Sequence, residues 1–155
     1  MITIRWKDIR YDVEQQTWRL AKTRITDAEL KDDAQADPDA SPNDVVLRFA
    51  EEGNAKVHAL LLPRIIKYGS VLSDDSLDKS ITAWEYMVDK CIDERSVAIL
   101  IHKFVVSYIL YKWSQIYFPD STQVFATDMA DAEQALNKET YNNSSAPKKM
   151  RPACK

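Results

Sequence analysis

The stretch at residues 97–118 reads VAILIHKFVVSYILYKWSQIYF and carries two series of mostly apolar side chains. Each series steps by three or four residues, and the two series fall on opposite sides of a helix. The first series contains Val97, Ile101, Phe104, Tyr108, Tyr111, Gln115 and Phe118. The second contains Ile99, His102, Val106, Ile109, Trp113 and Ile116. A helix that is apolar on both sides needs protein on both sides, so this stretch predicts the centre of a helical bundle or of an assembly.

The boundaries of this central helix follow from its flanking residues. Pro119 ends it, because proline has no amide hydrogen and its ring obstructs the preceding turn. At the other end, Asp93 fits the N-cap position and separates the helix from the apolar stretch before it. We therefore expect the central, two-sided helix to cover Ser96–Phe118.

Four further stretches place apolar residues on one side of a helix. They lie at about residues 6–24, 45–63, 81–92 and 121–141. Asn43 or Asp44 fits the N-cap of the second of these helices, and Gly69 fits a left-handed cap beyond its end. The sequence holds only two glycines, which also disfavours tight β-hairpins. Together these patterns predict an all-α fold, a bundle of about five helices.

The charge pattern divides the chain into one domain, a linker and a tail. Residues 1–141 form the predicted helical domain, with an acidic linker at 26–44 that holds seven acids against Lys31. Low hydrophobicity with one sign of charge predicts a loop there. Residues 142–155 carry four positive charges and no acid, which predicts a disordered basic tail.

Several classes of function are disfavoured by composition. With Gly53 and Gly69 as the only glycines, neither a dinucleotide-binding nor a phosphate-binding loop can be formed. Two histidines, His58 and His102, and two cysteines at unsuitable spacing do not make a zinc site. No catalytic constellation is recognisable, so we expect a protein that is not an enzyme and that needs no metal or cofactor.

The same composition bears on where the protein acts. Cys91 lies in an apolar stretch and Cys154 in the tail, so a disulfide between them is not expected. The N-terminus, MITIRWKDIR, is too charged for a secretory signal. Lys103 lies in the middle of the apolar stretch 97–111, which argues against a membrane span. We expect a cytoplasmic protein, or a virion-associated one if the chain is of phage origin.

Two alternative functions remain open. The first is a magnesium- or manganese-dependent hydrolase of nucleotide-like substrates, because Glu85, Asp89 and Asp93 form an acidic stripe on a helix at 81–92. Small all-α nucleotide pyrophosphohydrolases use acidic helix faces of this type to bind magnesium. The second is a nucleic-acid-binding module that uses the basic first helix and the tail.

The interpretation we favour is a non-catalytic subunit that binds other protein, above all copies of itself. The central helix has more aromatic residues than a small bundle buries easily, and leaving them in water would be costly. The residues predicted to make the interface are Phe104, Tyr108, Tyr111, Lys112, Gln115 and Phe118, with Lys148, Lys149 and Arg151 of the tail. By type, this outline fits a structural or adaptor component, such as a virion or prophage neck or tail-completion protein.

Overall fold

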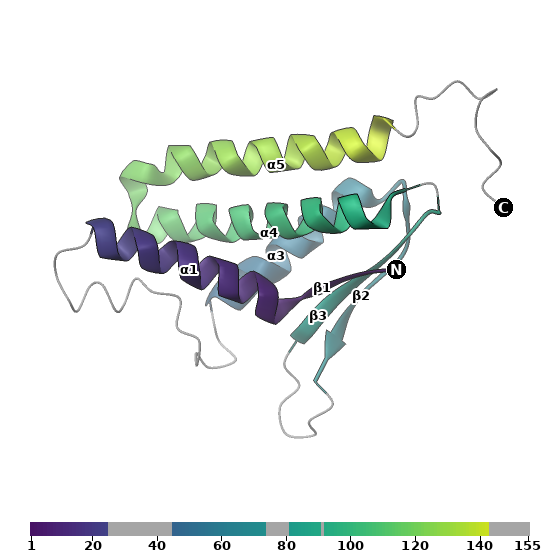
Figure 1. Ribbon diagram of the computed structural model, residues 1–155, viewed down its shortest axis with the longest axis horizontal. Coiled ribbons are helices and arrows are strands. Elements are labelled where there is room, and N and C mark those ends of the chain that lie inside the picture. Colours follow the sequence, from purple (N-terminus) through teal and green to yellow (C-terminus); the bar gives the residue numbers. More distant parts are fainter. Residues whose placement is uncertain (25–44, 74–80, 91, 143–155) are drawn as a thin grey trace.

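A computed structural model describes residues 1–24, 45–73, 81–90 and 92–142 (Figure 1). In chain order its elements are β1 (Ile2–Arg5), α1 (Trp6–Arg24), α3 (Val45–Leu61), β2 (Ile65–Leu72), β3 (Ile81–Val88), α4 (Glu94–Tyr117), the short 3-10 helix η1 (Pro119–Ser121) and α5 (Thr122–Asn142). The predicted linker at 26–44, and the predicted tail beyond its first residue, lie outside the described residues.

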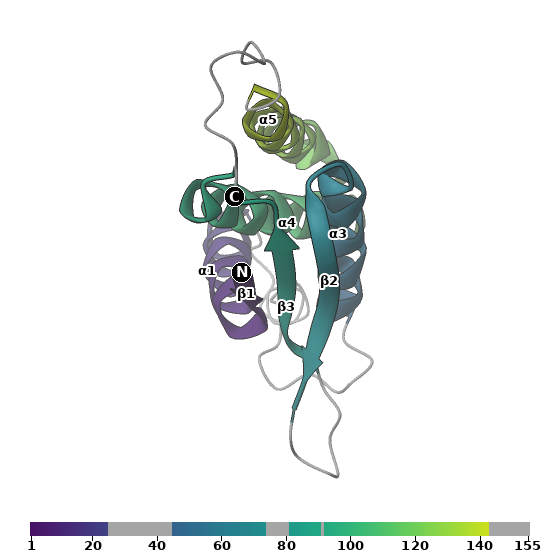
Figure 2. The same ribbon diagram turned by 90° about the vertical axis from the view of Figure 1, so that its right-hand side faces the viewer.

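The expectation of an all-α fold is wrong, because three of these elements are strands. They form one antiparallel sheet in the order β1-β3-β2. The sheet lies at one end of the helices, with α1 and α4 running away from it (Figures 1 and 2). The protein is therefore an α/β fold of four described helices and a three-stranded antiparallel sheet.

Residues 81–92, for which the spacing predicts a helix, mostly form strand β3 (Ile81–Val88). Ile81, Trp84 and Val88 have helical spacing, but Trp84, Tyr86 and Val88 also alternate. In the strand this alternation puts all three large side chains on the buried face. The strand is favoured because it pairs on both sides, with β1 and with β2.

The other two strands occupy segments for which no strand was predicted. β1 sets Ile2 opposite Tyr86 and Ile4 opposite Trp84, so that these four buried side chains form one face against the helices. β2 runs through Gly69, which was predicted to be a left-handed cap. Neither glycine has a positive φ, and Gly69 lies in the ladder with β3, so this prediction is also wrong.

Helix α4 is the centre of the fold, as its two apolar series predicted. It packs against α3, α5, α1 and β1, which lie on different sides of it (Figures 1 and 2). Its buried residues are Val97, Ile101, Phe104, Val105, Val106, Tyr108, Ile109, Leu110, Trp113 and Ser114. The second series is exposed at both ends, at Ile99 and Ile116. Other elements of the same chain therefore bury most of α4.

Where the structure has a helix at a predicted position, its bounds are close to the predicted ones, and α4 covers Glu94–Tyr117 where Ser96–Phe118 was predicted. α1 covers the predicted 6–24, and α3 ends at Leu61, just before Pro63. Asp93 is the N-cap of α4 and accepts a hydrogen bond from the Arg95 amide at 3.2 Å. A hydrogen bond from the Ser96 hydroxyl and that from the Arg95 amide lower the pKa of Asp93.

Among the described residues, α4 is the one helix that is long and apolar enough to cross a membrane by length and composition. More than half of its apolar window, 56%, is buried inside the fold. Its place in the core therefore accounts for its apolarity.

Candidate protein-binding surfaces

The predicted interface on α4 is partly buried within the fold, with Tyr108 packed against α3. Phe104 is 1% exposed and Tyr108 is 3% exposed. The two helices approach closely at Gly53 of α3, where an added Cβ would lie 3.2 Å from Cδ1 of Tyr108. Phe104 and Tyr108 are therefore core residues of the described fold.

Beyond Tyr108 the α3–α4 contact becomes polar. The Tyr108 hydroxyl donates a hydrogen bond of 3.0 Å to Oε2 of Glu52, and Nζ of Lys112 lies 3.5 Å from the same oxygen. The ammonium groups of Lys56 and Lys112 lie 4.9 and 5.7 Å from the centre of the Tyr108 ring. Burial and the hydrogen bond to Glu52 raise the pKa of Tyr108. This cluster closes the edge of the α3–α4 contact.

The remaining predicted interface residues lie toward the end of α4. Nε2 of Gln115 donates a hydrogen bond of 3.0 Å to the Tyr111 hydroxyl on the surface. Phe118 packs against Trp113, with ring centres 5.1 Å apart, and both contact the end of α1. Lys148, Lys149 and Arg151 lie outside the described residues. Of the predicted interface, the structure therefore leaves Tyr111, Lys112, Gln115 and Phe118 at least partly exposed.

The three acidic residues proposed for metal binding do not lie on one helix face in the fold. Glu85 lies in strand β3, Asp89 follows that strand, and Asp93 caps α4. Asp89 faces Nη1 of Arg64 at 3.7 Å. In the parts of the chain that the structure describes, no group of three His, Cys, Asp or Glu side chains could hold a metal ion. The helix on which the hydrolase hypothesis depended is absent at this place.

Neither histidine belongs to a metal cluster in the described part of the chain. His58 stacks on Tyr68 with ring centres 4.7 Å apart. His102 lies on α4, and its Nε2 is 2.8 Å from Oδ2 of Asp12 on α1. Both rings therefore make contacts between elements of the fold.

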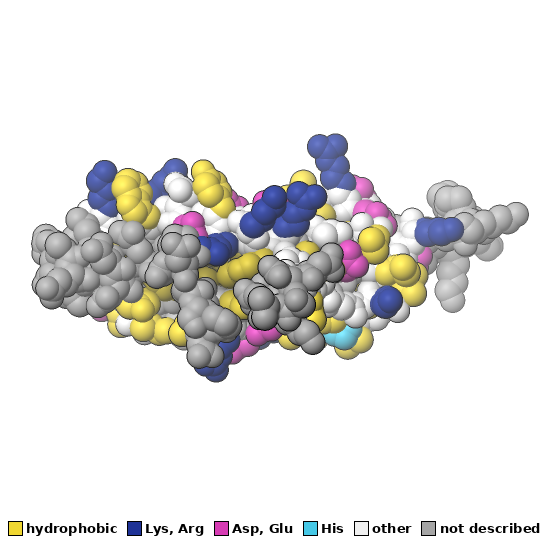
Figure 3. All heavy atoms as spheres, turned by 90° about the horizontal axis from the view of Figure 1, so that it is seen from below, with side chains coloured by type: hydrophobic (Ala, Val, Ile, Leu, Met, Phe, Trp, Pro, Cys, Tyr) yellow, Lys and Arg dark blue, Asp and Glu magenta, His cyan; other side chains and the backbone are white. Residues whose placement is uncertain are grey.

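The proposed basic surface of α1 is mixed in charge. Arg10 forms an ion pair of 2.8 Å with Glu14 one turn further along the helix. On the face shown in Figure 3, Lys and Arg side chains lie among acidic and hydrophobic ones. Among the described residues on that face, the basic side chains therefore form no continuous surface for a phosphate backbone.

The structure adds a surface that the sequence analysis missed, the outer edge of β2. β2 is an edge strand of eight residues, and no described strand pairs with its outer side. None of its residues is buried, whereas four of the eight in β3 are. Ile66 is 67% exposed and Leu72 is 48% exposed. The sequence IIKYGSVL, rich in β-branched residues, is the signal that could have identified this strand.

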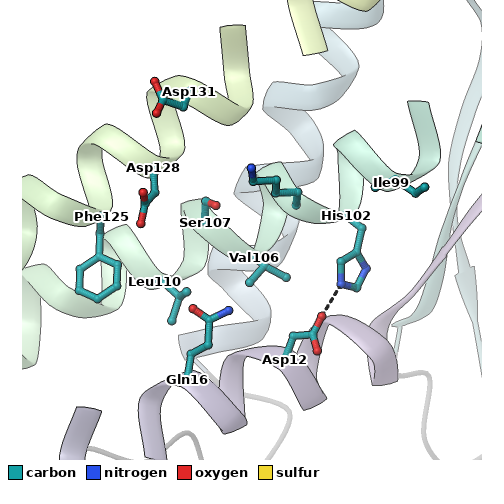
Figure 4. A pocket seen from close by; sticks show the side chains of 11 residues that line it. Asp12, Gln16, Ile99, His102, Val106, Ser107, Leu110, Phe125, Asp128 and Asp131 are labelled. Carbon is teal, nitrogen blue, oxygen red and sulfur yellow. Dashed lines mark hydrogen bonds and ion pairs between the residues drawn. The ribbon is translucent and has the colours of Figure 1, made fainter. Parts of the chain in front are cut away.

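A second unpredicted feature is a groove of about 470 Å³ between α1, α4 and α5, called here the α1–α4–α5 groove (Figure 4). Its walls are Asp12 and Gln16 of α1 and Phe125, Asp128 and Asp131 of α5. Its floor belongs to α4 and includes His102, Lys103, Val106 and Leu110. The groove is therefore acidic on both walls and partly apolar on its floor.

No protein-family model, no curated protein sequence and no solved structure matches this chain. Two surfaces of the described fold, the outer edge of β2 and the α1–α4–α5 groove, are therefore the candidate binding surfaces.

Proposed function

We propose that this protein is a non-catalytic assembly subunit that associates with copies of itself through the outer edge of β2. The observation that carries the proposal is an eight-residue edge strand with no buried residue and no described strand on its outer side. Such an edge presents a row of unpaired amide and carbonyl groups, which is a template for another strand. A second β2 satisfies these groups and extends the sheet from three strands to six.

The register of this pairing follows from charge and side-chain size. Antiparallel pairing of two β2 strands about Gly69 sets Ile66 of one copy opposite Leu72 of the other. It also sets Lys67 opposite Val71, which keeps the two lysines from facing each other directly. Gly69 has no side chain, and a Cβ there would meet nothing within 4 Å, so the two backbones can approach closely.

Exposed apolar residues at the two ends of β2, and Leu62 just before the strand, supply the driving force. Leu62, Ile66 and Leu72 are 59%, 67% and 48% exposed, respectively. Full burial of one such side chain is worth about 1.5–3 kcal/mol. The ladder is irregular between Ile65 and Lys67 and between Val71 and Leu72. Irregularities of this kind restrict edge pairing, so the regular ladder between two copies covers Lys67–Val71, and Ile66 and Leu72 pack at its two ends.

The proposal implies a structural or adaptor role, in the cytoplasm or in a virion. The alternatives have less support. A metal-dependent hydrolase would need Glu85, Asp89 and Asp93 on one helix face. A nucleic-acid module would need a basic surface, whereas Arg10 of α1 is already paired with Glu14. The proposed partner is therefore protein, and first of all a second copy of this chain.

Light scattering after size exclusion tests the proposal at micromolar concentration. We expect the wild type to have the mass of a dimer or larger species, and Ile66→Glu to have the mass of a monomer, because the variant buries a charge in the interface. The matched control is Val124→Glu on α5, since Val124 is 62% exposed and far from β2 in sequence and fold. A monomeric wild type, or dissociation by both variants alike, would contradict the proposal.

A further inference from the structure

The α1–α4–α5 groove carries an imbalance of charge that the described fold does not neutralise. Asp12 is paired with His102 at 2.8 Å. Asp128 and Asp131 are exposed on the α5 wall and make no hydrogen bond or ion pair with any residue that the structure describes. Lys103 is the groove's one lysine or arginine. The α5 wall therefore offers two carboxylates to a cationic ligand (Figure 4).

We propose that this groove binds the basic segment 148–151 of the same chain, which reads KKMR. The segment follows α5, whose own face forms the acidic wall, and it holds Lys148, Lys149 and Arg151 with no acid nearby. Opposite charges and a short connection favour this occupant over an unrelated partner, because a tethered ligand has a high effective concentration.

The length of the connection matches the positions of the acids. Asp131 precedes the end of α5 at Asn142 by eleven residues, which is about 17 Å along a helix. Asp128 lies about 21 Å from that end. Lys148 and Lys149 follow Asn142 by six and seven residues, and an extended chain of that length spans about 20–25 Å. A chain that turns back at Asn142 therefore brings the two lysines level with the two aspartates.

The segment also fits the two kinds of surface in the groove. In an extended chain successive side chains point to opposite sides, so Lys149 and Arg151 share one side and Met150 takes the other. Lys149, one of the two lysines level with the aspartates, can then face the α5 wall while Met150, on the same side as Lys148, meets the apolar floor at Val106 and Leu110. The inference makes no use of the β2 edge, so either proposal can fail without the other.

A zero-length carbodiimide crosslink on the full chain tests this inference. The reagent joins a lysine amine to a carboxylate that it contacts, and mass spectrometry of the digest identifies the pair. We expect a crosslink within one chain between Lys148 or Lys149 and Asp128 or Asp131. Its yield should fall several-fold at about 1 M salt, where screening acts over about 3 Å.

Two variants distinguish binding of the segment in the groove from nonspecific electrostatic association. Asp128→Asn combined with Asp131→Asn should abolish the crosslink, and Asp120→Asn, an exposed acid in η1 outside the groove, should leave it unchanged. Circular dichroism checks that the variants stay folded. Crosslinks spread over acids outside the groove, or none from these lysines, would overturn the inference. A product joining two chains would also overturn it, since it would place the segment in the groove of a second copy.

Discussion

The α3–α4 contact and strand β2 are both rich in apolar residues, yet only the first is covered by the chain itself. At the α3–α4 contact, Gly53 lets the helices approach until Tyr108 and Val105 fill the space between them. Along β2 no residue is buried, and nothing lies within 4 Å of where a Cβ on Gly69 would be. The difference shows that an apolar sequence pattern predicts a surface that must be buried. It does not show whether the same chain or another chain buries that surface. For β2, we propose that a second copy buries it.

The largest expected change in unfolding free energy comes from a substitution in the buried part of α4. Ile101 is fully buried and Ile99, on the same helix, is 63% exposed. Ile101→Ala should lower the free energy of unfolding by about 2–5 kcal/mol, because it leaves a cavity in the core. Ile99→Ala should change it by less than about 0.5 kcal/mol. Denaturant titration measures both, and equal losses would contradict the enclosure of α4.

The two glycines give a direct comparison of the two regions. Gly53→Val should cost about 1–3 kcal/mol of unfolding free energy, because its side chain would collide with Tyr108 and Val105. Gly69→Val should be neutral or stabilising by up to about 1 kcal/mol, since space is open there and valine suits a strand. Denaturation at concentrations where the chain is monomeric measures both. A greater cost at Gly69 would mean that β2 is covered within the chain.

A pH titration examines the join between α3 and the sheet. The Tyr86 hydroxyl donates a hydrogen bond to Oδ1 of Asn54 inside the fold. Burial, and secondly the charge of Tyr68, raise the pKa of Tyr86 above its ordinary value of 10.0. A tyrosine in the unfolded chain ionises near pH 10 while folded Tyr86 stays neutral, so stability is full below about pH 10 and falls above it.

The size of this effect follows from linkage. Each pH unit above 10 should remove up to about 1.4 kcal/mol of unfolding free energy through Tyr86. Tyr86→Phe should start less stable and lose less between about pH 9 and pH 11. Denaturant titrations across that range measure the slopes. Parallel slopes for the two proteins would show that Tyr86 ionises normally in the fold.

The smallest expected effect is at the polar edge of the α3–α4 contact. Lys112→Ala removes an ion pair with Glu52, whose side chain is 47% exposed, and should cost no more than about 1 kcal/mol. The effect should shrink at high salt because the pair is partly screened. Lys103→Ala on the same helix is the control, since Lys103 makes no ion pair in the described part of the chain. A loss that is unchanged by salt would point to packing of the Lys112 stem instead.

The helices were predictable because each repeats its apolar side over many turns. In α1, Ile9, Val13 and Thr17 are all fully buried, as their spacing predicted. In α5, Ala132 and Leu136 face the core in the same way. Such long patterns are redundant, so one misleading residue does not change the interpretation.

The sheet was missed because its strands are short and their patterns are ambiguous. Residues 81–88 satisfy a helical and an alternating pattern together, and the choice depends on pairing with β1 and β2, which local spacing does not contain. Gly69 resembled a helix cap because it follows a predicted helix closely, although the β-branched residues of IIKYGSVL around it favour a strand. The unpaired edge of β2 and the α1–α4–α5 groove arise from the arrangement of several elements. Local sequence patterns therefore could not predict either surface.

The most direct measurement of the central claim is disulfide formation by Gly69→Cys. Antiparallel pairing about this residue brings the two Cα atoms to about 4.5–5.5 Å, within the range for a disulfide. Ser70→Cys is the register control, because the two Ser70 residues are then offset by two positions along the strands, and the wild type controls for the two native cysteines. We predict a disulfide-linked dimer from Gly69→Cys under mild oxidation, well above the yield of both controls. A yield no greater than theirs would contradict self-association through β2.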